Sequence, residues 1–191
     1  MYNLVNLSQI IDAGGENSAA LLLSTFSSKN HDVQAFIRNN AIDFAVRRIA
    51  VTYLVVSDHD DIVGLFTLAN KIATFPIEGL SKSQEKRLQR FATLDSTGEY
   101  YTSPAILIAQ FSKNSNLKQE HSIKGSELML IALDKIRQVQ ELIGGKIVWL
   151  ECESDNENAL AFYSSNDIDF KEFSRRESAE GTLYIQMLKW L

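Results

Sequence analysis

The sequence predicts a mixed α/β (α+β) sandwich, in which helices flank a sheet of parallel and antiparallel strands. The first observation is a pair of segments rich in β-branched and aromatic residues, 49–56 and 62–73, separated by a short polar turn. Such a pair predicts an antiparallel hairpin. The second observation is the order strand, helix, strand over residues 105–109, 126–143 and 146–152. A helix between two strands packs against the sheet that they form, so this order predicts the mixed α/β class.

The composition is that of a globular protein with a single domain over residues 1–191, because 45% of the residues are hydrophobic and 23% are charged. The net charge of -5 argues against a dedicated nucleic-acid binder, although it allows a local basic patch. A lone cysteine, Cys152, cannot form an internal disulfide and fits a reducing compartment. No apolar run approaches the roughly 20 residues of a membrane span, and residues 1–7 lack the pattern of a signal peptide. We therefore expect a cytoplasmic protein without a membrane partner.

The N-terminal part predicts one short strand and two helices. Residues 4–7 are the strand, and Asn17 with Ser18 can cap a helix over residues 19–26. Asp32 can cap the next helix. The apolar residues of that helix recur at helical spacing: Val33, Phe36, Ile37, Ala41, Phe44 and Ala45.

Residues 74–104 are the least regular part of the chain and contain both prolines, Pro76 and Pro104. A short helix is expected over residues 81–92, where four basic residues against Glu85 give a net charge of 4 − 1 = +3. The basic residues are Lys82, Lys86, Arg87 and Arg90. This charge is typical of a solvated helix face, and the alternative is a flap with a basic face on the substrate side.

The C-terminal half gives the clearest secondary-structure signals. Residues 126–143 carry a broad apolar face at helical spacing, and Gly144 with Gly145 suits the end of a helix. Residues 147–150 are nearly continuously apolar, as in a strand covered on both faces. The alternation over residues 182–190 predicts a final strand.

The polar loop before Gly125 is the first candidate binding site. A loop that opens a helix presents free backbone amides and the positive end of the helix dipole, which suit a pyrophosphate. Gly125 would allow a close approach, Ser126 could add a hydroxyl, and Lys124 and Lys118 could screen phosphate charge. The same pattern is also compatible with an ordinary structural turn.

The order strand, loop, helix and strand is followed by Asn156-x-x-Ala159-x-x-Phe162-Tyr163. This arrangement resembles the acyl-CoA-binding half of the GNAT family of N-acetyltransferases. The resemblance implies a mixed, mostly antiparallel central sheet flanked by helices, in which the fourth and fifth strands splay apart. It also implies acetyl-CoA as acyl donor, no metal, and a single acetyltransferase domain with an insertion at about residues 74–104.

The phosphate loop departs from the family pattern Gln/Arg-x-x-Gly-x-Gly/Ala. The matching positions run from Glu120 to Gly125, with Ile123 at the first glycine, and the loop is about two residues longer than usual. The helix N-terminus is retained despite these departures. The resemblance therefore implies that the pyrophosphate is bound by one stretch of chain: Ser122, Ile123, Lys124, Gly125 and Ser126.

The resemblance also implies contacts along the rest of the acyl donor. Main-chain groups of Phe111, Ser112 and Lys113 would pair with the pantetheine arm, and Asn156 would contact the same arm near the helix start. Tyr163 would place its hydroxyl beside the thioester sulfur and protonate the departing thiolate as general acid. The alternative is that Phe162 and Tyr163 are ordinary core aromatics. The family continues Tyr-x-x-x-Gly-Phe, whereas this chain lacks the glycine and reaches Phe170 after a longer turn.

The general base is not identified by the sequence. Glu99, Asp95 and Glu151 are candidates, although each also suits a surface or structural role. His59 and His121 fit loop positions, and no spacing typical of a metal site is present. Cys152 at the end of an apolar strand suits a structural thiol better than a nucleophile.

Segments of the N-terminal half, at 30–41, 52–56 and 63–68, are similar to the GNAT subgroup that includes toxins acetylating aminoacyl-tRNA. The acidic balance and the 74–104 insertion depart from that subgroup, because RNA binding depends on neutralising phosphates. The remaining basic clusters are local: Arg38 with Arg47 and Arg48, the 82–90 helix, and Arg175 with Arg176. The fold and the acyl-CoA chemistry are therefore expected, while tRNA is not the favoured substrate.

Three functions are compatible with these patterns. The leading one is an acetyl-CoA-dependent N-acetyltransferase that moves an acetyl group directly to a primary amine, carried by a small molecule or a macromolecule, with a homodimer also compatible. The second is a non-catalytic acyl-CoA-binding regulatory domain, which the degenerate loop and the unidentified base favour. The third is a toxin whose partners are tRNA and an antitoxin.

Overall fold

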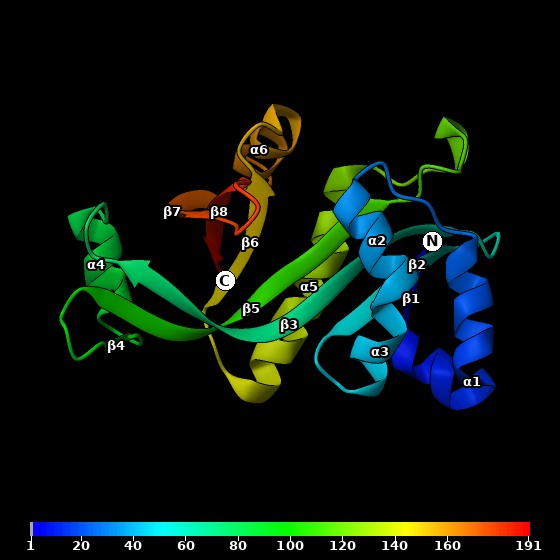
Figure 1. Cartoon of the computed structure of the whole chain (residues 1–191), viewed down its shortest axis with the longest axis horizontal. Coiled ribbons are helices and arrows are strands. Elements are labelled where there is room, and N and C mark those ends of the chain that lie inside the picture. The colour runs from blue at the N-terminus through cyan, green and yellow to red at the C-terminus, as the bar shows by residue number, and fades with distance from the viewer. Residues whose placement is uncertain (1) are drawn as a thin grey trace. The chain divides into compact units, whose positions relative to one another are not determined.

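The structure is a computed structural model that describes residues 2–191. The helices and strands (Figure 1) are β1 (Tyr2–Asn6), α1 (Leu7–Ser24), α2 (His31–Asn39), α3 (Ala41–Val46), β2 (Val51–Ser57), β3 (Ile62–Pro76), α4 (Lys82–Leu88), β4 (Thr93–Leu94), β5 (Tyr100–Lys113), η1 (Gln119–His121), α5 (Gly125–Ile143), β6 (Ile147–Glu153), α6 (Glu157–Ser164), β7 (Lys171–Glu177) and β8 (Leu183–Trp190).

The strands form an eight-stranded sheet in the order β1-β2-β3-β5-β6-β8-β7, with β4 attached to β5. The pairing of β5 with β6 is parallel, whereas β1 with β2, β2 with β3, β4 with β5, β6 with β8, and β7 with β8 are antiparallel. The predicted fold class, a mixed and mostly antiparallel sheet flanked by helices, is therefore confirmed.

The chain divides into two compact units, Met1–Ala69 with Ile108–Lys135, and Asn70–Leu107 with Ile136–Leu191. Strands β3 and β5 and helix α5 contribute residues to both units. A single acetyltransferase domain over the whole chain remains a prediction.

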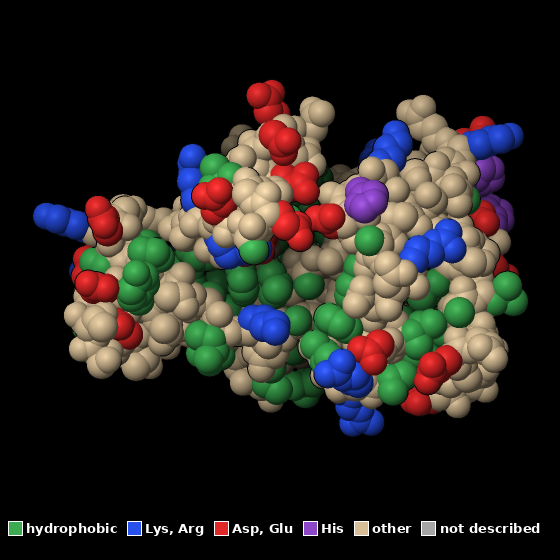
Figure 2. Space-filling view, in the orientation of Figure 1, with side chains coloured by type: hydrophobic (Ala, Val, Ile, Leu, Met, Phe, Trp, Pro, Cys, Tyr) green, Lys and Arg blue, Asp and Glu red, His purple; other side chains and the backbone are tan. Residues whose placement is uncertain are grey.

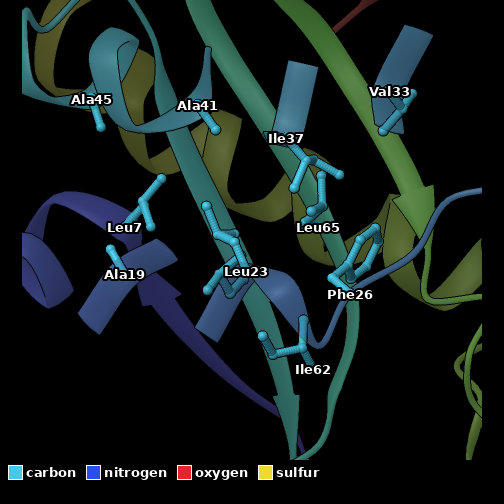
Figure 3. Close-up of a cluster of buried hydrophobic side chains, with 11 residues drawn as sticks. Leu7, Ala19, Leu23, Phe26, Val33, Ile37, Ala41, Ala45, Ile62 and Leu65 are labelled. Carbon is cyan, nitrogen blue, oxygen red and sulfur yellow. The ribbon is translucent and has the colours of Figure 1, made fainter. Parts of the chain in front are cut away.

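The core of the first unit lies between helices α1 to α3 and strands β2 and β3. Figure 3 shows apolar side chains from the three helices meeting Ile62 and Leu65 of β3, and each of them is buried. The side chain of Asn30 accepts a hydrogen bond from the Val33 amide, so Asn30 caps α2, and the prediction that Asp32 is the cap was wrong. An asparagine at this position satisfies an amide that the first turn leaves free.

The first helix is longer than the sequence predicted. Asn6 caps α1 at Ser8, and the helical segment before Gly15 was not expected. Gly15 breaks the helical backbone with φ 78° and ψ 171°, a conformation that glycine tolerates. The predicted helix over residues 19–26 is therefore the second half of α1, which ends at Ser24.

The second unit is built on β6, β8 and β7, with α6 and the 74–104 segment attached. Strand β8 pairs with β6 over Ile147↔Trp190 to Glu153↔Tyr184, so β8 is a central strand and β7 is the last in the order. Helix α4 begins with a complete capping box between Ser81 and Gln84, which explains why this short helix forms.

The 74–104 segment packs on β6 and β8 through an apolar cluster. Its buried members on the segment are Phe75, Leu88 and Tyr101, and those on the strands include Trp149 and Leu188. Beyond Pro76 the chain remains paired, because the amide of Ile77 donates to the carbonyl of Glu99 at 2.9 Å. The segment is therefore an arm with its own core contacts and not an irregular loop.

The parallel pairing of β5 with β6 is short. It consists of Ile106↔Val148 and Leu107↔Trp149, although β5 continues to Lys113 and β6 to Glu153. The strands expected to splay therefore stop pairing after Leu107 and Trp149.

Candidate active site

The N-terminus of α5 retains part of the predicted phosphate-binding geometry. Amides of the first helical turn have no intrahelical acceptor, and Gly125 is the first residue of α5. Gly125 is not among the glycines with positive φ, so its backbone conformation does not itself demand glycine. The carboxylate of Glu127 accepts a hydrogen bond from the Lys124 amide at 3.1 Å and adds negative charge to this helix end.

The residues before Gly125 have distinct structural roles. Ile123 is fully buried, which explains an apolar residue where the family has glycine, and leaves only its backbone for a ligand. The hydroxyl of Ser122 donates to the carbonyl of Gln119 within η1. The participation of Ser122, Ile123, Lys124, Gly125 and Ser126 in pyrophosphate binding remains a prediction.

Packing of α5 on β3 positions this helix end within the first unit. Leu128 is fully buried, and a side-chain carbon placed at Gly64 would lie 2.9 Å from both its Cδ atoms. The same position lies 3.3 Å from the carbonyl oxygen of Ser112. Gly64 thus permits the close approach of helix and strand.

The three β5 residues expected to pair with pantetheine do not present the same edge. The Asn114 amide donates to the carbonyl of Val63, which places the main chain of Asn114 toward β3. The Ser112 carbonyl, 3.3 Å from the Cβ position of Gly64, also faces β3. By strand alternation the main-chain groups of Phe111 and Lys113 are expected toward the other edge. The Ser112 hydroxyl contacts that of Ser28 at 2.8 Å.

Asn156 is the N-cap of α6. Its side-chain oxygen accepts a hydrogen bond from the Ala159 amide at 3.1 Å, so the asparagine of the motif has a local structural role. A contact between Asn156 and the acyl donor remains a prediction, with the side-chain NH₂ group as the donor.

Tyr163 lies on α6 among aromatic side chains. Its ring centroid is 5.3 Å from that of Phe162 and 6.2 Å from that of Phe170. Burial, with a smaller effect of neighbouring Cys152, raises the pKa of the Tyr163 phenol well above its ordinary value. The hydroxyl therefore stays protonated at neutral pH, as a proton donor must.

Cys152 is buried in β6, and burial, with the negative charges of Glu153 and Asp155, raises the pKa of its thiol to about 11. A thiol with this pKa carries little thiolate at neutral pH, and the thiolate is the nucleophilic form. The structural role expected for Cys152 therefore agrees with its surroundings.

Glu151 is the candidate base with the most specific surroundings. Its carboxylate accepts hydrogen bonds from Arg176 Nε at 2.9 Å, Arg176 Nη2 at 2.6 Å and Gln186 Nε2 at 2.8 Å. Desolvation alone would raise the pKa of Glu151, but these hydrogen bonds outweigh it and lower the pKa. The carboxylate is thus kept ionised, and both of its oxygens accept hydrogen bonds.

The other two candidate bases lie at the turn between β4 and β5. Asp95 accepts hydrogen bonds from Thr97, Tyr100 and the amide of Glu99, so it organises that turn. The side chain of Thr97 is the largest cause of a pKa of about 2 for Asp95. A carboxylate of such low pKa is a weak base.

The two loop histidines lie close together, with ring centroids of His59 and His121 6.2 Å apart. Within residues 2–191, no group of three or more His, Cys, Asp or Glu side chains is arranged to hold a metal ion. In the same part of the chain, no helix has the length and apolarity needed to cross a membrane.

Sequence reasoning missed three residues that the register of the second unit brings to Glu151. Arg176 and Gln186 bond its carboxylate, and Trp149 lies two residues before it on the same face of β6. Alternation along residues 147–153 could have placed Trp149 with Glu151. The partners from β7 and β8 could not be found without the strand pairing.

In sequence, the chain matches no protein-family model and no curated protein. In structure, it is similar to AtaT in complex with acetyl-methionyl-tRNAfMet, with 16% identity and a TM-score of 0.62, over 96% of this chain and 94% of AtaT. It is also similar to a tyrosine-to-phenylalanine mutant of KacT, with 16% identity and a TM-score of 0.65, over 99% and 94%. A bacterial toxin structure with 11% identity and a TM-score of 0.65 covers 100% of this chain and 90% of the toxin.

These likenesses show that the chain has the fold of the toxins AtaT and KacT over nearly its whole length. They agree with the resemblance to GNAT acetyltransferases that the strand, loop and helix order predicted. The fold is thus GNAT-like, with the architecture of these toxins.

Proposed function

We propose that this protein is an acetyl-CoA-dependent N-acetyltransferase that acetylates the amino group of an aminoacyl-tRNA. The observation that carries the proposal is the likeness over 96% of the chain to AtaT bound to acetyl-methionyl-tRNAfMet. This reverses the preference drawn from composition, which placed tRNA behind other amines. A net charge of -5 describes the whole surface, whereas nucleic-acid binding depends on local charge.

The residues present fit an acyl-CoA donor, which supplies the activated acetyl group. The N-terminus of α5 offers free amides of its first turn for phosphate, with Lys124 and Lys118 nearby in sequence. The main-chain groups of Phe111 and Lys113 on the outward edge of β5 suit pairing with an amide-containing arm. Glu127 counts against phosphate binding, because its negatively charged carboxylate lies at the same helix end.

The proposed chemistry is direct transfer. The acceptor nitrogen forms a bond to the acyl carbon as the bond to sulfur breaks, and the departing sulfur takes the proton of the Tyr163 hydroxyl. The surplus proton of the amine leaves to water, and Tyr163 is reprotonated from solvent. The Cys152 thiol, with its pKa near 11, takes no covalent part. A tyrosine replaced by phenylalanine in solved structures of AtaT and KacT supports Tyr163 as the residue to test.

An antitoxin is part of the same proposal. A tyrosine-to-phenylalanine mutant of AtaT has been solved with the C-terminus of the antitoxin AtaR and acetyl-CoA, and that structure shares 12% identity with this chain at a TM-score of 0.56. We accordingly place the protein in the cytoplasm, where charged tRNA is found, with a protein partner that restrains it.

The test is acetyl transfer by the purified full-length chain to bulk tRNA charged with all amino acids. After nuclease digestion, mass spectrometry should detect N-acetylaminoacyl-adenosine in the presence of acetyl-CoA. Uncharged tRNA should give no product, which separates the amino group from the nucleotides. If the protein acetylates small amines and does not acetylate charged tRNA, the proposal that aminoacyl-tRNA is the acceptor is overturned. Acetyl-CoA binding without transfer to any amine would favour the non-catalytic alternative.

A further inference from the structure

The face of β6 that carries Glu151 has three features that acyl-CoA binding and proton donation by Tyr163 do not explain. Alternation along the strand places Ile147, Trp149 and Glu151 on one face, while Leu150 and Cys152 point to the other. Their partners on β8 are Trp190, Leu188 and Gln186. Tyr163 packs on Phe170, which lies with Ile185 and Met187, the β8 partners of Cys152 and Leu150, so Tyr163 belongs to the opposite face from Glu151.

The first feature is an apolar recess beside the arm. Figure 2 shows hydrophobic side chains at the surface between α4 and the strands β6 and β8, where the surface is hollowed. The buried cluster there is bordered by hydrophobic residues that remain partly exposed: Ile77, Leu80, Ala92, Leu107, Phe173 and Trp190. Arg87 lies 4.3 Å from the ring centroid of Trp190 and covers one side of that indole.

The second feature is an unused hydrogen-bond donor. Trp149 is only 9% exposed, and its buried indole N–H has no hydrogen-bond partner among residues 2–191. A buried donor without an acceptor is costly, so such groups are rare and point to a ligand or to water. The ring itself is fixed by packing, with its centroid 6.4 Å from that of Phe173.

The third feature is the remaining capacity of the Glu151 carboxylate. A carboxylate has about four lone-pair sites, and Arg176 and Gln186 occupy three of them. The side chain is 23% exposed, so the remaining site is open to a donor from outside. Arg176 is itself held over the ring of Tyr184 at 4.9 Å, which fixes the position of the carboxylate.

These features match the three parts of one chemical group. We propose that this face of β6 binds the aminoacyl end of the acceptor, with an apolar side chain in the recess, the amino group on Glu151 and the ester carbonyl on the indole N–H of Trp149. The inference rests on the proposed function and deepens it, because it assigns the amine-binding residues and a preference for apolar aminoacyl groups.

The arrangement also fits direct transfer. Glu151 and Tyr163 flank a single strand from opposite faces, so the acceptor amine and the leaving-group proton donor would approach the acyl group from different sides. The pairing of β5 with β6 ends at Trp149, so the sheet does not continue past this position on that edge. Glu151 acts here as a binding residue, because hydrogen bonds already keep it ionised.

The experiment measures steady-state acetylation of tRNA charged with methionine, glycine or aspartate. The wild type should prefer methionyl-tRNA to the other two by at least about tenfold in kcat/KM. Glu151→Gln should raise the KM for methionyl-tRNA by roughly tenfold or more, the scale of a lost charged hydrogen bond. Trp149→Phe should raise the same KM by roughly fivefold because it removes the indole N–H. It also replaces a buried indole by a smaller ring, so a lower unfolding temperature is expected and the KM is read on the folded variant.

The matched control is Glu172→Gln, which breaks another arginine–glutamate pair of β7, that with Arg175 at 2.6 Å. It should leave the KM unchanged, and none of the variants should alter acetyl-CoA affinity in calorimetry. If Glu151→Gln fails to fold because Arg176 loses its partner, Glu151→Gln/Arg176→Gln removes both charges and carries the same test.

Two outcomes separate the inference from the function on which it rests. A wild type that acetylates charged tRNA, with an unchanged KM in Glu151→Gln and Trp149→Phe and no preference for methionine, would overturn the inference alone. A wild type that acetylates no charged tRNA would overturn the proposed function, and the inference with it.

Discussion

Replacing Gly64 by alanine should destabilise the protein by overpacking α5 against β3. The added methyl group would lie 2.9 Å from both Cδ atoms of Leu128, which is fully buried and cannot swing into solvent. Overpacking of this kind costs about 1–3 kcal/mol, while the loss of glycine's freedom in the unfolded chain returns about 0.4–1 kcal/mol. The net loss of unfolding free energy should be about 1–2 kcal/mol, or a Tm lower by about 2–8 °C for a chain of this size.

Thermal and urea unfolding, followed by circular dichroism, measure this loss. The control is a double-mutant cycle with Leu128→Ala, which alone should cost about 2–5 kcal/mol because it leaves a cavity. In that background Gly64→Ala should cost almost nothing, because its methyl group occupies space that the leucine vacates. An equal cost of Gly64→Ala in both backgrounds would show that the contact with Leu128 is not the cause.

The same variant links packing to the proposed function, because Leu128 lies in the first turn of α5, whose amides are assigned to the pyrophosphate. A shift of this turn should weaken acetyl-CoA binding in calorimetry even where the protein remains folded. Recovery of affinity in Gly64→Ala/Leu128→Ala would tie the loss to the displaced helix. Weak acetyl-CoA binding in both the single and the double variant would instead show that the change in strand β3 is the cause.

Four further outcomes are expected. Tyr163→Phe should reduce kcat by roughly 100-fold or more while leaving the fold intact, and an unchanged rate would make Tyr163 a packing residue. Gly125→Asp should weaken acetyl-CoA binding by at least about tenfold without unfolding α5, because an acid at a helix start opposes phosphate but not the helix. Charge reversal at Lys86 and Arg90 should raise the KM for charged tRNA and flatten its salt dependence, with acetyl-CoA affinity constant, if the arm contacts the tRNA backbone. Hydrogen bonds within its own turn lower the pKa of Asp95 to about 2, so its contribution to stability is present above about pH 4 and lost as pH falls toward 2; the Tm difference between wild type and Asp95→Asn should shrink over that range.

Local patterns in the sequence determined most elements of this fold. Helix α5 was predicted because its apolar residues recur at helical spacing and Gly144 follows it, with φ 77° in the structure. The strand from 147 and the helix after Asn156 were likewise visible, since each depends on residues close in sequence. The phosphate-loop candidate came from a local pattern, whereas the role of Tyr163 came from the resemblance to the GNAT family, and both remain predictions.

Only the tertiary structure decided which distant residues meet. The arm is ordered because β3 and β5 remain paired up to Ile77 and Glu99, and because Leu88 reaches the cluster around Trp149, contacts that sequence spacing does not encode. Glu151 meets Arg176, 25 positions away, only through the register of β6, β8 and β7. Strand register sets which side chains share a face, and it is fixed by the burial of the whole sheet. The proposed acceptor site could therefore be seen only after folding.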